Sequence, residues 1–469
     1  MTSTGKLDTH RKALTINLDA STFGSFAEIG AGQEVVRWFL LVGGASGTVA
    51  KSISAYDKEV SDSLYGTGSR YVSRERLEAM LETEWTQLLG QLDKSRGKDK
   101  RFFSFVDTVS ARNYSGTNDA HGWLGLRFQS RPGEEPSDII LHINMRDSSN
   151  ALQQEAIGIL GVNLLYAAFY QLQTKESFFE GVGQDVVRGR IEIDCVDFRG
   201  PAFANWDRPT LLAYLVHAGL AEAVCFLPSG EVLPPNEFLH NKAVVLAPGY
   251  FGHVDPVHAQ IHTQMLLAGI RELRRELGQP TSGPIGCFCL SAAPIGAQQS
   301  TPEIPDLLSR INALLAQGGN VLLFRERELF NMTALANRYT KAPLRFIAGL
   351  SLLVRAFADP YFHLEGRLLE ALARLFAQNV RVYGYPMTVK DLQQAVKVLP
   401  AVDLEWSETN GCVSAEQLRF KPPLAHLYAY LLASNFLVPV RVSAELPGDA
   451  NHSASIREDE PAVGEVCSA

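Results

Sequence analysis

The sequence is poor in cysteine, in basic charge and in long apolar runs. Its six cysteines include no CxxC pair, which argues against a disulfide framework and a structural zinc site. The 43 basic residues are outnumbered by 51 acidic ones, so the formal net charge is -8 and nucleic acid is not an expected partner. The most apolar stretch, 157–170, is too short to cross a bilayer and contains Asn163.

The first residues, MTSTGKLDTHRK, carry no apolar segment after their basic side chains, so they do not predict a secretory signal. The chain has 469 residues, of which 46% are hydrophobic and 20% charged. This balance is typical of a globular protein with two or three domains. We therefore expect a cytoplasmic protein with no membrane partner.

Residues 1–200 predict a mixed α/β domain. Three segments rich in Phe, Val, Ile and Leu are strand-like, and two longer segments have helical character with a serine cap before the first. The expected strands are 101–109, 123–129 and 138–145, and the expected helices are 73–92 and 152–172. Strands followed by a covering helix indicate an α+β layer.

Residues 201–442 change to an alternation of helix and strand. The expected strands are 223–227, 243–247, 285–290, 320–324 and 380–385, and the expected helices are 210–219, 260–277, 305–317, 328–339, 365–376 and 425–434. This alternation is typical of βαβ units and predicts a doubly wound, mostly parallel, Rossmann-like sheet. Residues 443–469 contain six acidic side chains and no aromatic one, which predicts a disordered tail.

The segment KAVVLAPGYFGHVDPVHAQIHTQMLL (242–267) carries the strongest chemical signal. An apolar strand leads into Gly249, and Asp255-Pro256 then starts a helix that contains His258 and His262. A strand, a glycine loop and a helix start are how α/β proteins present backbone amides to phosphate. Histidines in the first helical turn can stabilise charge on a transferring nucleotide.

This segment resembles the nucleotidyltransferase signature Gly-x-Phe-x-Pro-x-His-x-Gly-His at Gly249, Phe251, Pro256 and His258. The resemblance implies that His258 is catalytic, that Gly249, Phe251, Pro256 and His262 contact the nucleotide, and that ATP and Mg²⁺ take part. Four residues separate Phe251 from Pro256 where the signature has one, and Ile261 occupies the place of its second histidine. Two other interpretations remain open: a metal site formed by His258 and His262 with His253 and Asp255, and a histidine-rich helix start without chemistry.

A second candidate is the glycine-rich segment within residues 24–57. Gly43, Gly44 and Gly47 precede Lys51, in an order similar to a phosphate loop but without Walker A spacing. Glycines can equally serve positive φ angles or close packing. The segment therefore predicts either a nucleotide-binding loop or a structural turn.

The chain as a whole resembles an uncharacterised bacterial protein family. The resemblance spans about 24–434 and is carried by FAEIGAGQEV, GGASGTVAKSISAYD, YGTGSRYVSRERLEAML, HGWLGLRF, LGVNLLYAAF, DPYFHLEGRLLEALARLF, RVYGYPM and LAHLYAYLL. That family carries two labels, nicotinate-nucleotide adenylyltransferase and TonB-dependent receptor, and the α/β pattern agrees only with the first. It implies binding of a small-molecule nucleotide or phosphate ester, with adenylyl transfer to a mononucleotide if active. The alternative is a catalytically inactive scaffold or self-assembling homo-oligomer that retains the fold.

Overall fold

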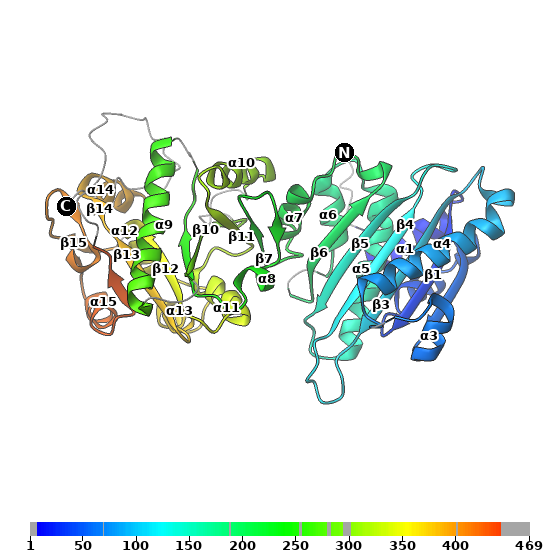
Figure 1. Cartoon of the computed structure of the whole chain (residues 1–469), viewed down its shortest axis with the longest axis horizontal. Coiled ribbons are helices and arrows are strands. Elements are labelled where there is room, and N and C mark those ends of the chain that lie inside the picture. The colour runs from blue at the N-terminus through cyan, green and yellow to red at the C-terminus, as the bar shows by residue number, and fades with distance from the viewer. Residues whose placement is uncertain are drawn as a thin grey trace. The chain divides into compact units, whose positions relative to one another are not determined.

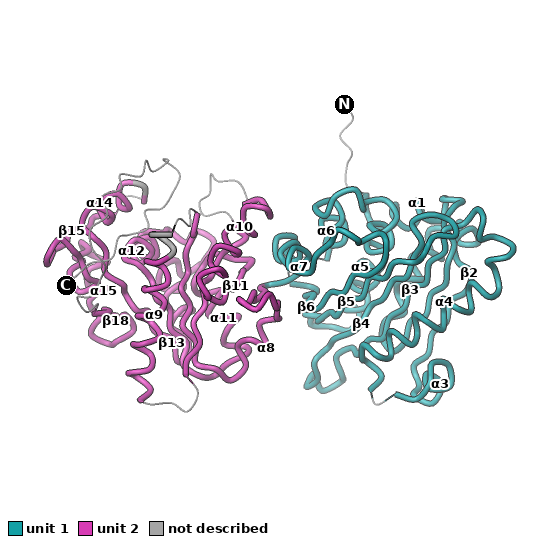
Figure 2. Tube along the Cα trace, turned by 45° about the horizontal axis from the view of Figure 1, so that its top comes forward, with its two compact units in different colours: residues 1–222 teal, residues 223–469 magenta. Residues whose placement is uncertain are grey.

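A computed structural model describes residues 7–68, 70–186, 189–252, 256–278, 283–293, 302–399 and 402–441. The chain forms two compact units, residues 1–222 (unit 1) and 223–469 (unit 2) (Figure 2). The predicted tail, 443–469, lies outside the described residues. Within the described parts of the chain, no helix is long and apolar enough to cross a membrane.

Unit 1 is built on a six-stranded mixed sheet with the order β2-β1-β3-β4-β5-β6 (Figure 1). β1 pairs in parallel with β2 and β3, and the pairs from β3 to β6 are antiparallel. The strands are β1 (Thr22–Gly30), β2 (Val49–Ala55), β3 (Arg101–Ser110), β4 (His121–Phe128), β5 (Ser137–Met145) and β6 (Ile191–Arg199).

Helices cover both faces of this sheet. Ala27 and Ile29 pack with Leu77 of α4 on one face, whereas Phe26 contacts Phe39 of α2 on the other, as strand alternation requires. α4 begins after Ser73, whose hydroxyl accepts a hydrogen bond from an amide of the first turn, so the predicted cap is confirmed. The helices are α1 (Thr9–Leu18), α2 (Val35–Leu41), η1 (Ala45–Gly47), α3 (Lys58–Tyr65), α4 (Arg74–Arg96), α5 (Asn150–Tyr170), α6 (Lys175–Gly183), η2 (Pro201–Phe203) and α7 (Arg208–His217).

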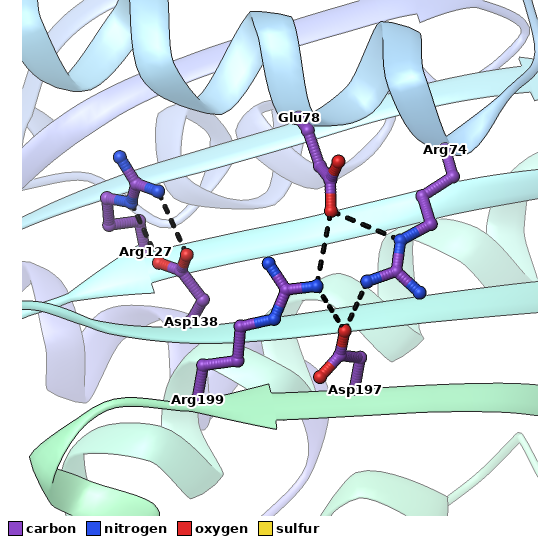
Figure 3. A network of polar contacts seen from close by, with 6 residues as sticks. All are labelled: Arg74, Glu78, Arg127, Asp138, Asp197 and Arg199. Carbon is purple, nitrogen blue, oxygen red and sulfur yellow. Dashed lines mark hydrogen bonds and ion pairs between the residues drawn. The ribbon is translucent and has the colours of Figure 1, made fainter.

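An ionic network joins α4 to β4, β5 and β6. Figure 3 shows its members, Arg74, Glu78, Arg127, Asp138, Asp197 and Arg199. Arg127 and Asp138 are cross-strand partners whose two parallel hydrogen bonds measure 2.8 and 2.9 Å. Asp197 receives hydrogen bonds from both Arg74 and Arg199. The network is partly exposed, so each ion pair contributes at most about 1 kcal/mol.

Unit 2 contains an eight-stranded sheet with the order β18-β13-β12-β9-β10-β11-β7-β8. The pairs from β18 to β11 are parallel, and β7 and β8 form an antiparallel edge. The strands are β7 (Ala223–Phe226), β8 (Val232–Leu233), β9 (Val244–Pro248), β10 (Ile285–Ser291), β11 (Asn320–Phe324), β12 (Leu344–Gly349), β13 (Val380–Tyr385) and β18 (Leu437–Pro439). Two small ribbons join β14 (Met387–Thr388) to β16 (Cys412–Val413), and β15 (Leu404–Trp406) to β17 (Leu418–Phe420).

The helices of unit 2 lie on both faces of its sheet. Val245 and Ile347 face Gly269 of α9, whereas their neighbours Leu246 and Phe346 join the apolar cluster of α11, α12 and α13. The helices are α8 (Pro235–Leu239), α9 (Pro256–Leu277), α10 (Ile304–Leu315), α11 (Leu329–Tyr339), α12 (Leu350–Ala358), α13 (Arg367–Leu375), α14 (Val389–Val398), η3 (Ala415–Gln417) and α15 (Leu424–Ala433). The predicted α/β class, with a doubly wound, mostly parallel second domain, is confirmed.

Candidate functional site

The strand order of unit 2 reverses between β9 and β12. From β9 the chain adds β10 and β11 on one side, then returns to add β12, β13 and β18 on the other. The pairing of β9 with β12 ends at Leu246 and Phe346, although β9 continues to Pro248 and β12 to Gly349. The two carboxyl ends therefore stop pairing at the reversal, and open α/β sheets bind their ligands outside such a switch point.

The loop after β9 begins with Gly249, Tyr250 and Phe251. Phe251 has a φ of 53°, and its buried ring lies edge-on to His262 and Phe288 at centroid distances of 4.7 and 5.4 Å. A Cβ on Gly249 would lie 2.7 Å from that ring. Position 249 therefore needs glycine because the aromatic ring of the loop folds back over the strand end.

Arg310 of α10 fixes this loop from the next helix. Its guanidinium donates to the Tyr250 carbonyl oxygen at 3.3 Å and to the Tyr250 hydroxyl at 2.7 Å. It also stacks on the Tyr250 ring, 3.9 Å from the centroid, and pairs with Asp306. The side chain is 7% exposed, so the loop starts from a rigid, positively charged support.

The predicted signature residues are brought together only in part. Phe251 and His262 are buried against each other, with His262 4% exposed, and the exposed Gly249 lies against the Phe251 ring. α9 begins at Pro256, where the sequence predicted a helix start, and His258 lies in its first turn. The side chains of Pro256 and His258, and the residues His253 and Asp255, lie outside the described residues.

The glycine-rich segment forms a turn in unit 1. Gly43 and Gly44 have φ angles of 83° and 74°, and Asn17 donates to the carbonyl oxygens of Phe39 and Gly43 at 2.8 and 2.7 Å. The backbone amide of Gly47 donates a hydrogen bond to the carbonyl oxygen of Gly44 at 3.0 Å, which closes η1. These glycines give α2 a tight exit into β2, and they belong to a different unit from Gly249.

Lys51 projects from the edge strand β2. Its ammonium lies 2.6 Å from Glu84 Oε2 and 2.9 Å from Gln87 Oε1, both on α4. The Glu84 side chain is 1% exposed and also accepts the Tyr65 hydroxyl at 2.8 Å. The ammonium therefore neutralises a buried carboxylate of its own unit.

A buried carboxyl pair lies on adjacent strands of unit 1. Glu28 of β1 and Asp107 of β3 are register partners, and Glu28 accepts the amides of Val35 and Val36 at 2.8 and 3.1 Å. Asp107 is fully buried and neither of its oxygens has a well-directed hydrogen bond among the described residues. Burial raises the pKa of Glu28 to about 7, and the charge of Glu34 adds to the shift. Burial, followed by the charge of Glu28, raises the pKa of Asp107, and the nearby Ile29 amide offsets only part of the rise.

Our sequence interpretation did not select Asp107. Its signal is an acidic residue inside an otherwise apolar strand, RFFSFVDTVS, and Glu28 occupies the same kind of position in TFGSFAEIG. Within the described residues, no three or more His, Cys, Asp or Glu side chains form a group that could hold a metal ion.

No protein-family model and no curated protein matches this chain. Among solved structures, the competence/damage inducible protein CihA from Agrobacterium tumefaciens is 20% identical with a TM-score of 0.25, covering 35% of this chain and 98% of that chain. The competence or damage-inducible protein from Enterobacter asburiae is 15% identical with a TM-score of 0.24, covering 34% of this chain and 95% of that one. The CinA superfamily protein from Klebsiella pneumoniae is 14% identical with a TM-score of 0.25, and the match covers 34% of this chain and 95% of that one. None of these three carries a label that the resemblance implied.

Proposed function

We propose that unit 2 binds a nucleotide or another phosphate ester at the carboxyl ends of β9 and β12. The observation that carries this proposal is the reversal of strand order between these strands, with Gly249 directly after β9 and Gly349 as the last residue of β12. The order β11-β10-β9-β12-β13-β18 is that of sheets which bind dinucleotides at this point. Helix α9 begins at Pro256, shortly after this loop, and its first amides would bind the phosphate.

Gly349 offers a way to block this site without disturbing the fold. It has an extended backbone with a φ of -64°, and a Cβ there would meet its nearest atom, Met387 Sδ, only at 3.8 Å. A larger side chain is therefore compatible with the backbone at 349. The same change at Gly249 would strike the Phe251 ring and test packing instead.

The experiment measures the melting temperature and binding calorimetry of the full chain with ATP and with NAD, each with and without Mg²⁺. A ligand at a hundred times its Kd stabilises the folded state by about 2.7 kcal/mol. Gly349→Val should abolish that shift while keeping the unliganded melting temperature. Ala316→Leu, at the exposed end of α10 before β11, is the control that should bind normally. A shift that survives in Gly349→Val would place the ligand elsewhere.

The finer proposal is adenylyl transfer to a mononucleotide. A phosphate oxygen of the mononucleotide attacks the α-phosphorus of ATP, the bond to the bridging oxygen breaks, and pyrophosphate leaves. His258 would stabilise the charge that develops, and Mg²⁺ would be held by the nucleotide phosphates, since the described residues provide no three-ligand metal group. His258→Ala should lower turnover by roughly 3 kcal/mol of transition-state stabilisation while ATP affinity changes little. Pyrophosphate release with ATP and nicotinate mononucleotide measures this turnover.

A catalytically inactive scaffold predicts a different result. Neither nucleotide would then shift the melting curve, and light scattering would give a defined homo-oligomer that nucleotides leave unchanged. Nucleotide binding without pyrophosphate release would support the binding proposal and reject adenylyl transfer.

A further inference from the structure

A row of three polar side chains crosses β4, β5 and β6 of unit 1. His121 Nδ1 lies 3.1 Å from His142 Nε2, and His142 Nδ1 lies 2.5 Å from Asp194 Oδ1. The second oxygen of Asp194 accepts the side-chain amide of Asn144 at 2.7 Å. The ring of Trp123 covers His142 at a centroid distance of 4.8 Å. We call His121, His142 and Asp194 the His–His–Asp row.

Strand register places these residues on one face of the sheet. Trp123 is the direct partner of His142, and His121 the direct partner of Asn144, so the two histidines are diagonal neighbours. The pairing of β5 with β6 shifts between His142 and Ile143, where Cys195 opposes the first and Ile193 the second. Asp194 is thus the extra residue of a β-bulge, a device that redirects a side chain.

The hydrogen bonds determine where the protons lie. Asp194 Oδ2 accepts the Asn144 amide, and the contact of Asp194 Oδ1 with His142 Nδ1 favours the tautomer in which Nδ1 donates to the carboxylate. A neutral His142 then has its lone pair on Nε2, and His121 donates to it from Nδ1. The lone pair of neutral His121 is therefore on Nε2, which has no hydrogen-bond partner among the described residues.

The surroundings favour the neutral form of His121, which is half-buried. Burial lowers the pKa of His121, His142 and Arg70 lower it further, and Asp119 and Asp194 oppose them. The side chains of His142 and Asp194 are 17% and 22% exposed. Cys195, beside Asp194, remains a thiol because burial raises its pKa. A neutral base with a fixed tautomer and a nearby cation is the arrangement that general-base catalysis needs.

We propose that the His–His–Asp row is a proton-accepting catalytic site for a hydroxyl group of a small polar molecule or a water bound to it. The O–H bond breaks, the proton moves to His121 Nε2, and the electron pair stays on the oxygen. The positive charge on His121 is stabilised through His142 by Asp194, and the charge of Arg70, which lowers the pKa of His121, favours the negative oxygen. His121 is the catalytic residue, and His142 and Asp194 are positioning residues. The site belongs to unit 1 and does not depend on nucleotide binding by unit 2.

The first experiment is long-range ¹H–¹⁵N NMR of the full chain with labelled histidine between pH 4.5 and 8.5. We expect His121 and His142 in the Nδ1–H tautomer, and we expect His121 to take up its proton below the ordinary histidine pKa. Asp194→Asn removes the charge that raises the pKa of His121, so the midpoint should fall further. An Nε2–H tautomer of His121 would overturn the proposal, because that nitrogen could not accept a proton.

The second experiment measures the reactivity of each histidine towards diethyl pyrocarbonate by mass spectrometry. Asp194→Asn should slow modification of His121 at pH 7 by at least about tenfold, because an amide in place of the carboxylate favours the wrong tautomer. The exposed His10 of α1 is the internal reference and should react equally in both proteins. Equal modification of His121 in wild type and variant would overturn the relay, provided near-ultraviolet dichroism shows both to be folded.

A third measurement distinguishes proton transfer from metal binding. Equimolar Zn²⁺ alone should leave the melting temperature of the wild-type chain unchanged. If Zn²⁺ raised the melting temperature and His121→Gln abolished the increase, His121 and His142 would be metal ligands and the proposal would be wrong.

Discussion

Two units of similar size place their charged groups differently. In unit 1, Glu28 and Asp107 lie on the sheet face that α2 covers. The ionic network and the His–His–Asp row lie on the opposite face, which α4 covers. The described strands of unit 2 are apolar at their buried positions, with the exception of Arg345, which binds Glu276 of α9. The antiparallel half of unit 1 is only partly covered, whereas the parallel sheet of unit 2 is covered on both faces. Clusters of polar side chains on a sheet face are therefore a feature of unit 1, whereas the site that we propose in unit 2 lies in its loops.

The largest expected effect tests the apolar interior of unit 2. Phe346 is fully buried between β9 and α12, so Phe346→Ala should lower the free energy of unfolding of unit 2 by about 3–5 kcal/mol. Hydrogen exchange resolved by peptide measures this loss in unit 2 and no change in unit 1. Phe362→Ala, at a side chain that is 77% exposed, should cost under about 0.5 kcal/mol. Equal losses would show that this core is not tightly packed.

The next prediction tests the buried acid of unit 1 through pH. The unfolded carboxyl of Glu28 loses its proton near pH 4.5, whereas the folded one keeps it to about pH 7. The folded state binds more protons between these values, so the free energy of unfolding should fall by about 3 kcal/mol as pH rises through this window. Exchange in unit 1 should show this slope and exchange in unit 2 should not.

Two variants check its origin. Glu28→Gln should remove the part of the slope that Glu28 contributes and leave a smaller part from Asp107, whose pKa burial also raises. Glu34→Gln should lower the pKa of Glu28 only slightly, because Glu34 adds to the pKa shift without being its main cause. An unchanged slope in Glu28→Gln would assign it to another group.

A smaller effect is expected from Lys51. Lys51→Ala leaves the buried Glu84 without its cation, and should destabilise unit 1 by about 2 kcal/mol, less than a fully buried pair because Lys51 is 30% exposed. Nucleotide affinity should not change. Denaturant unfolding and calorimetry with ATP measure the two separately, and Lys98→Ala is the exposed control. Lost ATP affinity at unchanged stability would instead support a phosphate site.

The smallest effect concerns the turn before β2. Gly44→Ala should cost about 1 kcal/mol because the residue has a φ of 74°. Gly47→Ala should cost less, since its Cβ would only approach the Asn17 carbonyl at 3.3 Å and its φ is not left-handed. Denaturant midpoints rank the two, and the opposite ranking would show that packing outweighs backbone strain.

Periodicity predicted the second half of the chain well because parallel strands are short, apolar and separated by helices. The segments 243–247, 285–290 and 320–324 correspond to β9, β10 and β11. β12 was missed although Pro343 directly precedes it, since the strand Leu344–Gly349 is short and contains a charged Arg345. The strand order reverses because β12 pairs with β9. The sequence therefore predicted the loop of the candidate site but not the switch point beside it.

The glycine-rich segment shows where a local pattern leaves two interpretations open. β1 and β2 contain Glu28 and Lys51, and these polar residues made the segment look like a binding loop. Lys51 pairs with Glu84, which lies far away in sequence. Strand register places Glu28 beside the equally distant Asp107, while its carboxylate accepts the nearby amides of Val35 and Val36. The same holds for His121, His142 and Asp194, which only strand register brings together. Long-range pairing of this kind has no local signature.

The chain passes from unit 1 to unit 2 once, after Glu222, and this has a consequence for synthesis. At roughly 5–20 residues per second, a ribosome needs about 12 to 50 s for the rest of the chain, long enough for a mixed domain to fold. Unit 1 can thus be complete while the strands of unit 2 are still being made. The central sheet of unit 2 cannot close until Leu344 emerges to pair with Val244. Exposure of unpaired strands to chaperones and to other nascent chains therefore falls mainly on unit 2.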